Sequence, residues 1–571
     1  MPSTKPLRAT LLMIFALAAA GVSPLPPTYA EDAADLLLER GVFYPVRPAE
    51  PVHGSMAIRA GKIVYLGAAE GAAAFAGPET ARLDLAGRAV TPGLIDAHSH
   101  LFGLGAALVQ VDAVGTASYA EVIARVAAAA AGLPPGTWVL GRGWDQNDWP
   151  EQAFPHHREL SLAVPDHPVW LTRIDGHAAL LNAAALAALS LDDAVADPSG
   201  GRFLRDAEEH LSGVLVDNAM DAARGALPPP PPAEAARRLR LAAEHCLERG
   251  LTTVTDMGVS AGVIAAYDAL AAAGELPIRA ALYLTDDAEL LADWFARGPR
   301  LDAAGRLTVR GVKLYADGAL GSRGAALVEP YSDDDGNLGL LTSSGDHLAE
   351  VAVAAVRAGF QVAIHAIGDR GNLVALDALE TALAARAEGT EPAADPRLRI
   401  EHAQVMRLQD LERMARLGVI ASMQPTHATS DMPWAGERLG GRRLAGAYAW
   451  RKVLDAGGRL ALGSDFPVER AAPVLGLHAA VTRQDLDGEP AGGWLPGERL
   501  TRQEALAGFT LGAAEALFLD RLVGSLEVGK RADLVVWERD PMRVPAAEIP
   551  RTRADLTLVD GEIVHRRGGG A

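Results

Sequence analysis

Two histidines that flank a single serine, His98 and His100, are well suited to bind a metal ion. They follow the apolar run 90–97, which predicts a buried strand with an irregularity at Pro92 and Gly93. Residues two positions apart on a strand project from the same face, so both imidazoles can reach one ion. The pair alone is not specific, because two histidines around a small residue often have no function.

Four further polar residues stand where strands are expected to end: Lys313, His365, His402 and Asp465. Imidazole and carboxylate ligands suit zinc and related divalent ions. An unpaired ammonium in a barrel strand is costly, so Lys313 needs a partner or a chemical change. A buried lysine with a lowered pKa is nucleophilic, and its reaction with carbon dioxide gives a carbamate able to bridge two metals. Taken singly, His365 and His402 also fit structural roles, and Asp465 fits a helix cap.

The apolar runs predict the elements that position these residues. Strand-like runs, each followed by a helical segment, recur eight times, the number that a TIM (β/α)8 barrel needs. In such a barrel the carboxyl ends of all strands meet at one mouth. We therefore expect the six polar side chains to converge there. The runs are 90–97, 251–256, 278–284, 307–315, 360–365, 398–402, 419–424 and 459–463.

The predicted fold class is α/β, with the barrel spanning residues 89–515. Short β-like runs occur before and after it, at 31–88 and 516–571, and we expect the two sets to pair into one small β-sandwich. A long insertion, about 133–232, follows the first barrel strand. An insert at this place belongs on the catalytic face, where it can cover the mouth.

Residues 1–30 are typical of an export signal, with cleavage near Ala30 and a bacterial periplasmic location. Lys5 and Arg8 precede an apolar stretch, which is short for a membrane span; an uncleaved anchor is the alternative. The net charge of −19 argues against partners such as nucleic acid or anionic lipid. The single cysteine, Cys246, cannot form an internal disulfide and is predicted to be a core residue.

The motifs resemble the amidohydrolase superfamily, in particular its amidohydrolase-3 group of YtcJ-like proteins and N-substituted formamide deformylases. The resemblance runs from about residue 35 to 565, and its motifs are specific for the group but not for a substrate. The first matching motif is Thr-Pro-Gly-Leu-Ile-Asp-Ala-His-Ser-His at 91–100. The others lie at 312–324, 364–369, 400–404, 463–468 and 524–534.

The resemblance implies a metal-dependent hydrolase with a small-molecule substrate and one or two divalent ions, zinc being expected. His98, His100 and Asp465 are implied to hold one ion, and His365 and His402 a second. Carboxylated Lys313 is implied to bridge the ions, and Asp465 to act as general base. The bond expected to be cleaved is a carbon–nitrogen bond other than a peptide bond, in an amide, N-substituted formamide or cyclic amide.

Two other functions remain open at this point. The same scaffold supports a deaminase or an ester or lactone hydrolase. A periplasmic small-molecule binding protein without catalysis is the non-enzyme alternative, and the complete ligand set argues against it. The chain also leaves open whether it forms a homo-oligomer.

Several residues near the predicted mouth fit either substrate contact or a structural role. Those in the insertion are Trp144, Asp145, Asn147 and Trp149, together with a second polar group, His177 and Asn182. Those on loops after barrel strands are Arg323, His427, Trp434 and Arg483. Tryptophan and arginine there suit a substrate with an apolar part and a polar handle.

Overall fold

The computed structural model describes residues 33–224, 227, 229–302, 304–387 and 395–568. The predicted export signal, residues 1–30, lies outside these described residues. Eight parallel strands form the centre of the molecule and confirm the predicted barrel. They are β6 (Leu94–Asp96), β13 (Leu251–Val259), β14 (Arg279–Leu284), β16 (Leu307–Tyr315), β17 (Gln361–Ala366), β18 (Arg399–His402), β19 (Ile420–Met423) and β20 (Arg459–Leu462). A short strand, β15 (Arg300–Leu301), pairs antiparallel with β16.

The first and last barrel strands meet just beyond their carboxyl ends. The backbone N–H of Ala97 donates to Leu462 O at 3.2 Å, and that of Asp465 donates to His98 O at 2.7 Å. These bonds bring the segment after β6 against the segment after β20. Backbone hydrogen bonds therefore close the barrel at the end where the predicted ligands lie.

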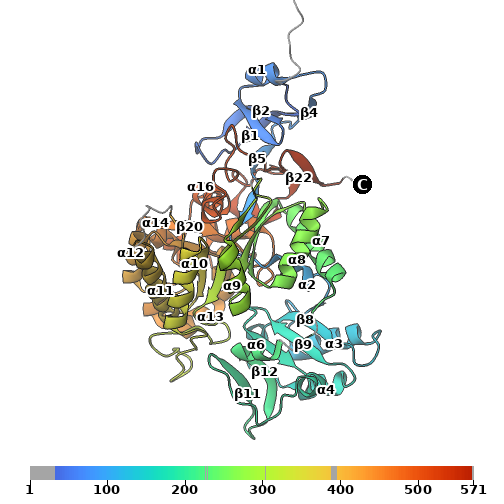
Figure 1. The fold of residues 1–571 in the computed structure, drawn as a ribbon, viewed down its shortest axis with the longest axis vertical. Helices are drawn as coiled ribbons and strands as arrows, with labels where there is room; N and C mark the ends of the chain where they lie inside the picture. Colours follow the sequence, from blue (N-terminus) through green and yellow to red (C-terminus); the bar gives the residue numbers. More distant parts are fainter. Residues whose placement is uncertain (1–32, 225–226, 228, 303, 388–394, 569–571) are drawn as a thin grey trace, which may run out of the picture.

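Helices cover the outside of the barrel, as the alternation in the sequence predicts (Figure 1). Strands such as β14 and β17 are buried along their whole length, which explains their continuous apolar runs. The helices that follow or precede barrel strands are α2 (Leu101–Ala107), α7 (Pro232–Leu247), α8 (Ala261–Ala272), α9 (Ala288–Arg297), α10 (Gly345–Arg357), α11 (Asp369–Ala387), α12 (Leu408–Leu417), α13 (Pro425–Leu444), α14 (Trp450–Asp455), α15 (Pro473–Thr482), α16 (Arg502–Ala507) and α17 (Ala513–Ala516). Within the described ranges, no helix is both long enough and apolar enough to span a membrane.

Strands from the two chain ends form one hydrogen-bonded sheet at one end of the barrel (Figure 1). The antiparallel pair β5–β21 joins the two sets, so the expected pairing of the chain ends is confirmed. Arg279 on β14 binds Asp533 and Asp560 and ties this sheet to the barrel. The strands are β1 (Leu36–Phe43), β2 (Val52–Arg59), β3 (Lys62–Gly67), β4 (Ala81–Asp84), β5 (Ala89–Pro92), β21 (Leu534–Trp537), β22 (Ala554–Val559) and β23 (Glu562–Arg566).

The insertion lies at the opposite end of the barrel from this sheet (Figure 1). It begins earlier than the predicted residue 133, because β7 (Val111–Asp112) and α3 (Tyr119–Ala130) belong to it. A strand of two residues carries no periodicity in the sequence, which explains the difference. The insert has a six-stranded sheet, whose other strands are β8 (Val139–Trp144), β9 (Val169–Arg173), β10 (Ala178–Leu181), β11 (Gly201–Arg205) and β12 (Leu211–Asp217). Its remaining helices are α4 (His157–Ala163), α5 (Ala183–Ala188) and α6 (Asn218–Arg224).

Candidate metal centre

The six predicted ligands stand on the ends of five barrel strands. His98 and His100 follow β6, and Asp465 follows β20. The other three lie on their strands: Lys313 in β16, His365 in β17 and His402 at the end of β18. All are buried except His100, which is partly exposed. The structure therefore places them together at the mouth that faces the insert.

Asp465 lies at the centre of the group. Its Oδ1 is 3.4 Å from His98 Nε2 and 3.1 Å from His100 Nε2. Lys313 Nζ is 3.4 Å from His98 Nε2. The His402 ring contacts the rings of His98 and His365, with centroids 4.7 Å and 4.5 Å away. The side chains therefore form one compact cluster of imidazoles with one amine and one carboxylate.

The donor set fits a divalent ion. Asp465 Oδ1 is buried and has no hydrogen-bond partner in the described part of the chain, although two imidazole nitrogens approach it. Ligand atoms of two groups lie within 4.8 Å of one another: His98, His100 and Asp465, and His402, His427 and Asp465. Such sets of imidazole nitrogens with one carboxylate oxygen are typical zinc ligands.

A buried carboxylate that sequence reasoning missed orients His98. Glu401 Oε2 lies 2.5 Å from His98 Nδ1, so the other ring nitrogen, Nε2, points to Asp465. Arg399 holds Glu401 through two bonds of 2.7 Å and 2.8 Å. A carboxylate behind a ligand histidine fixes its tautomer and raises its basicity. The available signal was a glutamate next to His402 in the short strand β18, all four residues of which are buried.

Two other ligand histidines, His100 and His402, are oriented in the same way. His100 Nδ1 lies 3.1 Å from Met257 O, and His402 Nδ1 lies 2.9 Å from Gln424 Oε1. A carbonyl oxygen can only accept, so Nδ1 of His100 carries the proton and Nε2 keeps its lone pair. The same tautomer for His402 leaves its Nε2 free to bind an ion.

Burial strongly affects the protonation states of the predicted ligand residues. It lowers the pKa of His365 and His402 well below the ordinary value, and it lowers the pKa of His98, an effect that Lys313 reinforces. Burial also lowers the pKa of Lys313 to about 8. It would raise the pKa of Asp465, but the surrounding histidines hold that pKa well below its ordinary value. Neutral imidazoles and an ionised carboxylate are the forms that bind metal.

Two of these residues have a left-handed backbone. His402 has φ 71° and Asp465 has φ 61°. For residues other than glycine this region costs on the order of 1 kcal/mol or more, and such strain concentrates at functional sites. His402 is the last residue of β18, and Asp465 lies in the loop after β20.

Two of the predicted pocket residues reach the ligand group. His427, in the first turn of α13, lies with Nε2 3.4 Å from Asp465 Oδ2 and Nδ1 3.0 Å from Glu469 Oε1. His177, from the insert, places its ring 4.9 Å from that of His365. The ring of His427 also stacks on that of His402 at 5.8 Å. His427 therefore lies among the possible ligands rather than in an outer pocket.

Four other pocket residues lie in structural positions, one of the two roles that the sequence left open for them. Trp144 is fully buried in the insert core, and its Nε1 donates to Leu171 O at 2.8 Å. Trp149 is also in that core, and its Nε1 donates to Thr116 O. Asn182 caps α5 and uses its amide within the insert. Arg483 is buried between Trp450 and Trp494.

The remaining pocket residues lie around the mouth without touching a ligand residue in the described contacts. Asp145 pairs with the buried Arg173. Arg323 pairs with Asp333 at 2.8 Å. Trp434 carries the Arg438 guanidinium over its ring at 4.2 Å, and Arg438 donates to Asn147 Oδ1 at 2.9 Å, a bond between barrel and insert.

Comparisons with known proteins agree with this geometry. The model of the amidohydrolase family matches residues 82–565. The chain is 34% identical to the protein LONG AFTER FAR-RED 3 of Arabidopsis thaliana, covering 88% of this chain and 87% of that protein. It is 31% identical to the putative amidohydrolase YtcJ of Bacillus subtilis, with coverage of 86% and 92%. It is 30% identical to the N-substituted formamide deformylase of Arthrobacter pascens, with coverage of 90% and 95%.

Solved structures resemble the chain over the same length. An uncharacterized metal-dependent hydrolase from Pyrococcus horikoshii has a TM-score of 0.72 and 31% identity, covering 90% of this chain and 99% of that one. The family match, the barrel and the ligand group lead to the same assignment. The chain belongs to the amidohydrolase family and is a metal-dependent hydrolase.

Proposed function

We propose that the protein hydrolyses a carbon–nitrogen bond other than a peptide bond in a small molecule: an amide, an N-substituted formamide or a cyclic amide. The observation that carries the proposal is the buried Asp465 Oδ1, which lacks a hydrogen-bond partner among the described residues and faces the imidazoles of His98 and His100. Similarity to an N-substituted formamide deformylase along nearly the whole chain supports this choice of bond.

In this proposal His98, His100 and Asp465 would hold one divalent ion, and His365 and His402 would hold a second. Zinc is the proposed metal, because imidazole and carboxylate ligands suit it. When bound, such ions lower the pKa of water and polarise a carbonyl oxygen. His427 is a further possible ligand, since it shares a ligand group with His402 and Asp465.

Lys313, as a carbamate, would add a further anionic ligand for the ions in this proposal. The neutral amine attacks carbon dioxide, a nitrogen–carbon bond forms, and one proton leaves to solvent. The side chain is buried, and its Nζ has no ion pair with a carboxylate in the described part of the chain. A carbamate would replace this buried, unpaired ammonium by an anion among histidines, which removes the cost of burying the charge.

Asp465 is the proposed proton carrier. Its carboxylate accepts a proton as water attacks the carbonyl carbon, and it later returns a proton to the departing nitrogen. The Nε2 atoms of His100 and His427 lie 3.1 Å from Oδ1 and 3.4 Å from Oδ2 of this carboxylate. The insert lies at the end of the barrel that carries the mouth (Figure 1).

The test uses the purified protein loaded with zinc. Elemental analysis should give close to two ions per chain, and a panel of N-substituted formamides, N-acyl amino acids and hydantoins should show release of amine or acid. Release of ammonia from aminated heterocycles alone would show a deaminase, and turnover of esters or lactones alone would show an esterase. Protein purified from metal-replete medium with no metal and no turnover would refute the proposal and favour a binding protein.

We also propose that the protein is exported and works in the bacterial periplasm. The proposal rests on the charge and apolar pattern of residues 1–30. Fractionation of cells that produce the full chain should recover the protein in the periplasmic fraction, with an amino terminus close to residue 31. Recovery of the uncleaved chain in the membrane fraction would show a retained anchor.

A further inference from the structure

The insert holds a histidine–aspartate pair against the ligand group. His177 lies between β9 and β10, and its ring centroid is 4.9 Å from that of His365. Its Nδ1 is 2.7 Å from Oδ1 of Asp217, the last residue of β12. The Asp217 side chain is 1% exposed and that of His177 is 17% exposed. The pair is therefore fixed within the insert and directed toward the barrel.

Two glycines of the barrel make room for Asp217. A side chain on Gly318 or on Gly324 would bring its Cβ to 2.5 Å from Asp217 Oδ2. Both glycines lie in the loop after β16, within the motif at 312–324. Asp217 itself has φ 50°, a left-handed conformation that aspartate and asparagine tolerate better than most residues. The barrel loop and the insert are thus shaped around this carboxylate.

The bond to Asp217 orients the imidazole. An ionised carboxylate can only accept, so His177 Nδ1 carries the proton and donates it to Asp217. His177 Nε2 has no hydrogen-bond partner in the described part of the chain, and the ring lies beside a proposed metal ligand. The described contacts therefore give His177 Nε2 no structural role within the insert.

We propose that His177, positioned by Asp217, contacts the substrate and accepts a hydrogen bond at Nε2 from an N–H or O–H group of the substrate beside the ligand group. The insert is then part of the active site, and it selects substrates that present such a donor on the side of His365. This inference rests on the proposed function, because it assumes that the reacting group binds at the candidate metal centre.

The test compares two substitutions of His177 in the zinc-loaded enzyme. His177→Phe keeps a ring but cannot accept, whereas His177→Gln places an amide oxygen near the position of Nε2. A buried donor left without an acceptor costs about 1–3 kcal/mol, so His177→Phe should lower kcat/KM for formanilide, which carries an N–H, about 5- to 100-fold. His177→Gln should recover activity to within about five-fold of wild type, since one neutral hydrogen bond contributes about 1 kcal/mol.

Asp217 is tested as a positioning residue. Asp217→Asn keeps an acceptor and tolerates the left-handed backbone, whereas Asp217→Ala removes the acceptor. We expect Asp217→Ala to lose about ten-fold in kcat/KM, the equivalent of one hydrogen bond, and Asp217→Asn to recover most of it. Equal metal content and unchanged unfolding transitions would show that neither variant acts through the fold.

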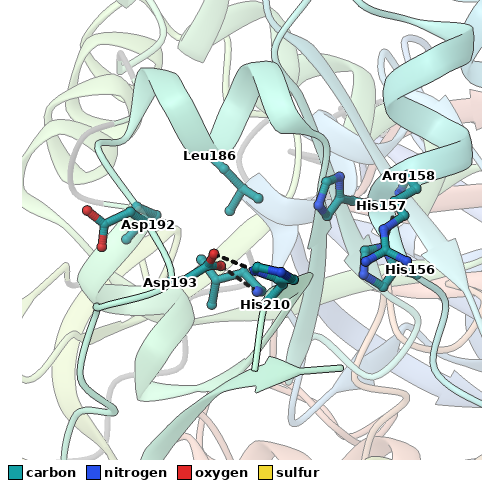
Figure 2. A pocket seen from close by; sticks show the side chains of 9 residues that line it. His156, His157, Arg158, Leu186, Asp192, Asp193 and His210 are labelled. Atoms are coloured by element: carbon teal, nitrogen blue, oxygen red, sulfur yellow. Dashed lines mark hydrogen bonds and ion pairs between the residues drawn. The ribbon is translucent and has the colours of Figure 1, made fainter. Parts of the chain in front are cut away.

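A second histidine–aspartate pair in the insert provides the matched control. His210 Nδ1 lies 2.7 Å from Asp193 Oδ2, and Figure 2 shows the two side chains facing each other. The pair lines a cavity of 320 Å³ together with His156 and His157, and its described contacts lie within the insert. His210→Phe should leave kcat/KM unchanged.

A measurement that needs no turnover separates this inference from the proposed function. Calorimetric titration with benzohydroxamate should show weaker binding to His177→Phe than to wild type, and recovery in His177→Gln. Equal affinity and equal kcat/KM in wild type and His177→Phe would overturn the inference, as would a His177→Gln variant as impaired as His177→Phe. A wild-type enzyme that releases no aniline from formanilide would count against the proposed bond, and the hydroxamate comparison would still decide the role of His177.

Discussion

Removal of the Glu401 carboxylate should destabilise the fold and the metal centre together. Glu401 and Arg399 are both 0% exposed, and Glu401 also accepts from His98. Burial would raise the pKa of Glu401, but Arg399 and His98 lower it to about 2, so the carboxylate is ionised at neutral pH. Glu401→Ala leaves a buried guanidinium without its counter-charge. Breaking a buried pair in this way costs about 3–5 kcal/mol.

The second consequence concerns metal affinity. Without Glu401, His98 loses the acceptor for its Nδ1 proton and is no longer held with Nε2 toward Asp465. Loss of such an outer partner typically costs about 10- to 100-fold in metal affinity. Glu401→Gln keeps the size and one acceptor oxygen, so it should lower metal affinity while costing about 1–3 kcal/mol of stability.

Urea unfolding of metal-free protein measures the first effect, and competition with a chelator measures the second. Glu380→Ala serves as the control, because Glu380 pairs with Arg413 but is 46% exposed. A surface pair of this kind contributes about 0–1 kcal/mol, and its loss should leave metal affinity unchanged. A Glu401→Ala variant within about 1 kcal/mol of wild type in the free energy of unfolding, with wild-type metal affinity, would refute the reasoning.

Three shorter predictions follow from other residues. Lys313→Ala should lose metal and activity, and added short carboxylic acids should restore part of both; full activity in Lys313→Arg, which cannot form the same bridge, would exclude the carbamate. Asp465→Asn should lower kcat by about 10²- to 10⁴-fold in folded protein that retains at least one metal, and a near wild-type kcat would show that another group moves the proton. Arg451 and the Thr501 cap lower the pKa of Glu504 from 4.5 to about 2, so its stabilising contribution is complete above pH 4.5 and is lost as the pH falls toward 2. Glu504→Gln should therefore flatten the decline of the thermal midpoint between those pH values, and a decline as steep as in wild type would contradict the assignment.

The sequence by itself determined the barrel and the positions of the six predicted ligands. Eight apolar runs alternate with helical segments, and parallel strands in a closed barrel bring their carboxyl ends to one mouth. His98, His365, His402 and Asp465 are therefore neighbours as a consequence of topology alone. Polar residues at the ends of buried strands are a strong signal, because such positions are costly to leave unpaired.

Only the tertiary structure decided how side chains outside the barrel strands are used. Trp144 and His177 both lie in the insert, yet Trp144 packs in the insert core while His177 reaches the ligand group. Arg483 follows a helix at the barrel top but lies between two tryptophans. The sequence cannot separate these cases, because the direction of a loop side chain depends on how the insert and the barrel pack together.

The partners of the ligands were also decided by the fold. Glu401 meets His98 across a separation of 303 residues, and Asp217 meets His177 across a separation of 40 residues. Local periodicity carries information about the face on which a residue lies, but not about which distant residue it will meet. For this chain, the sequence therefore determined which residues come to the mouth, and the packing of barrel and insert decided how they are oriented there.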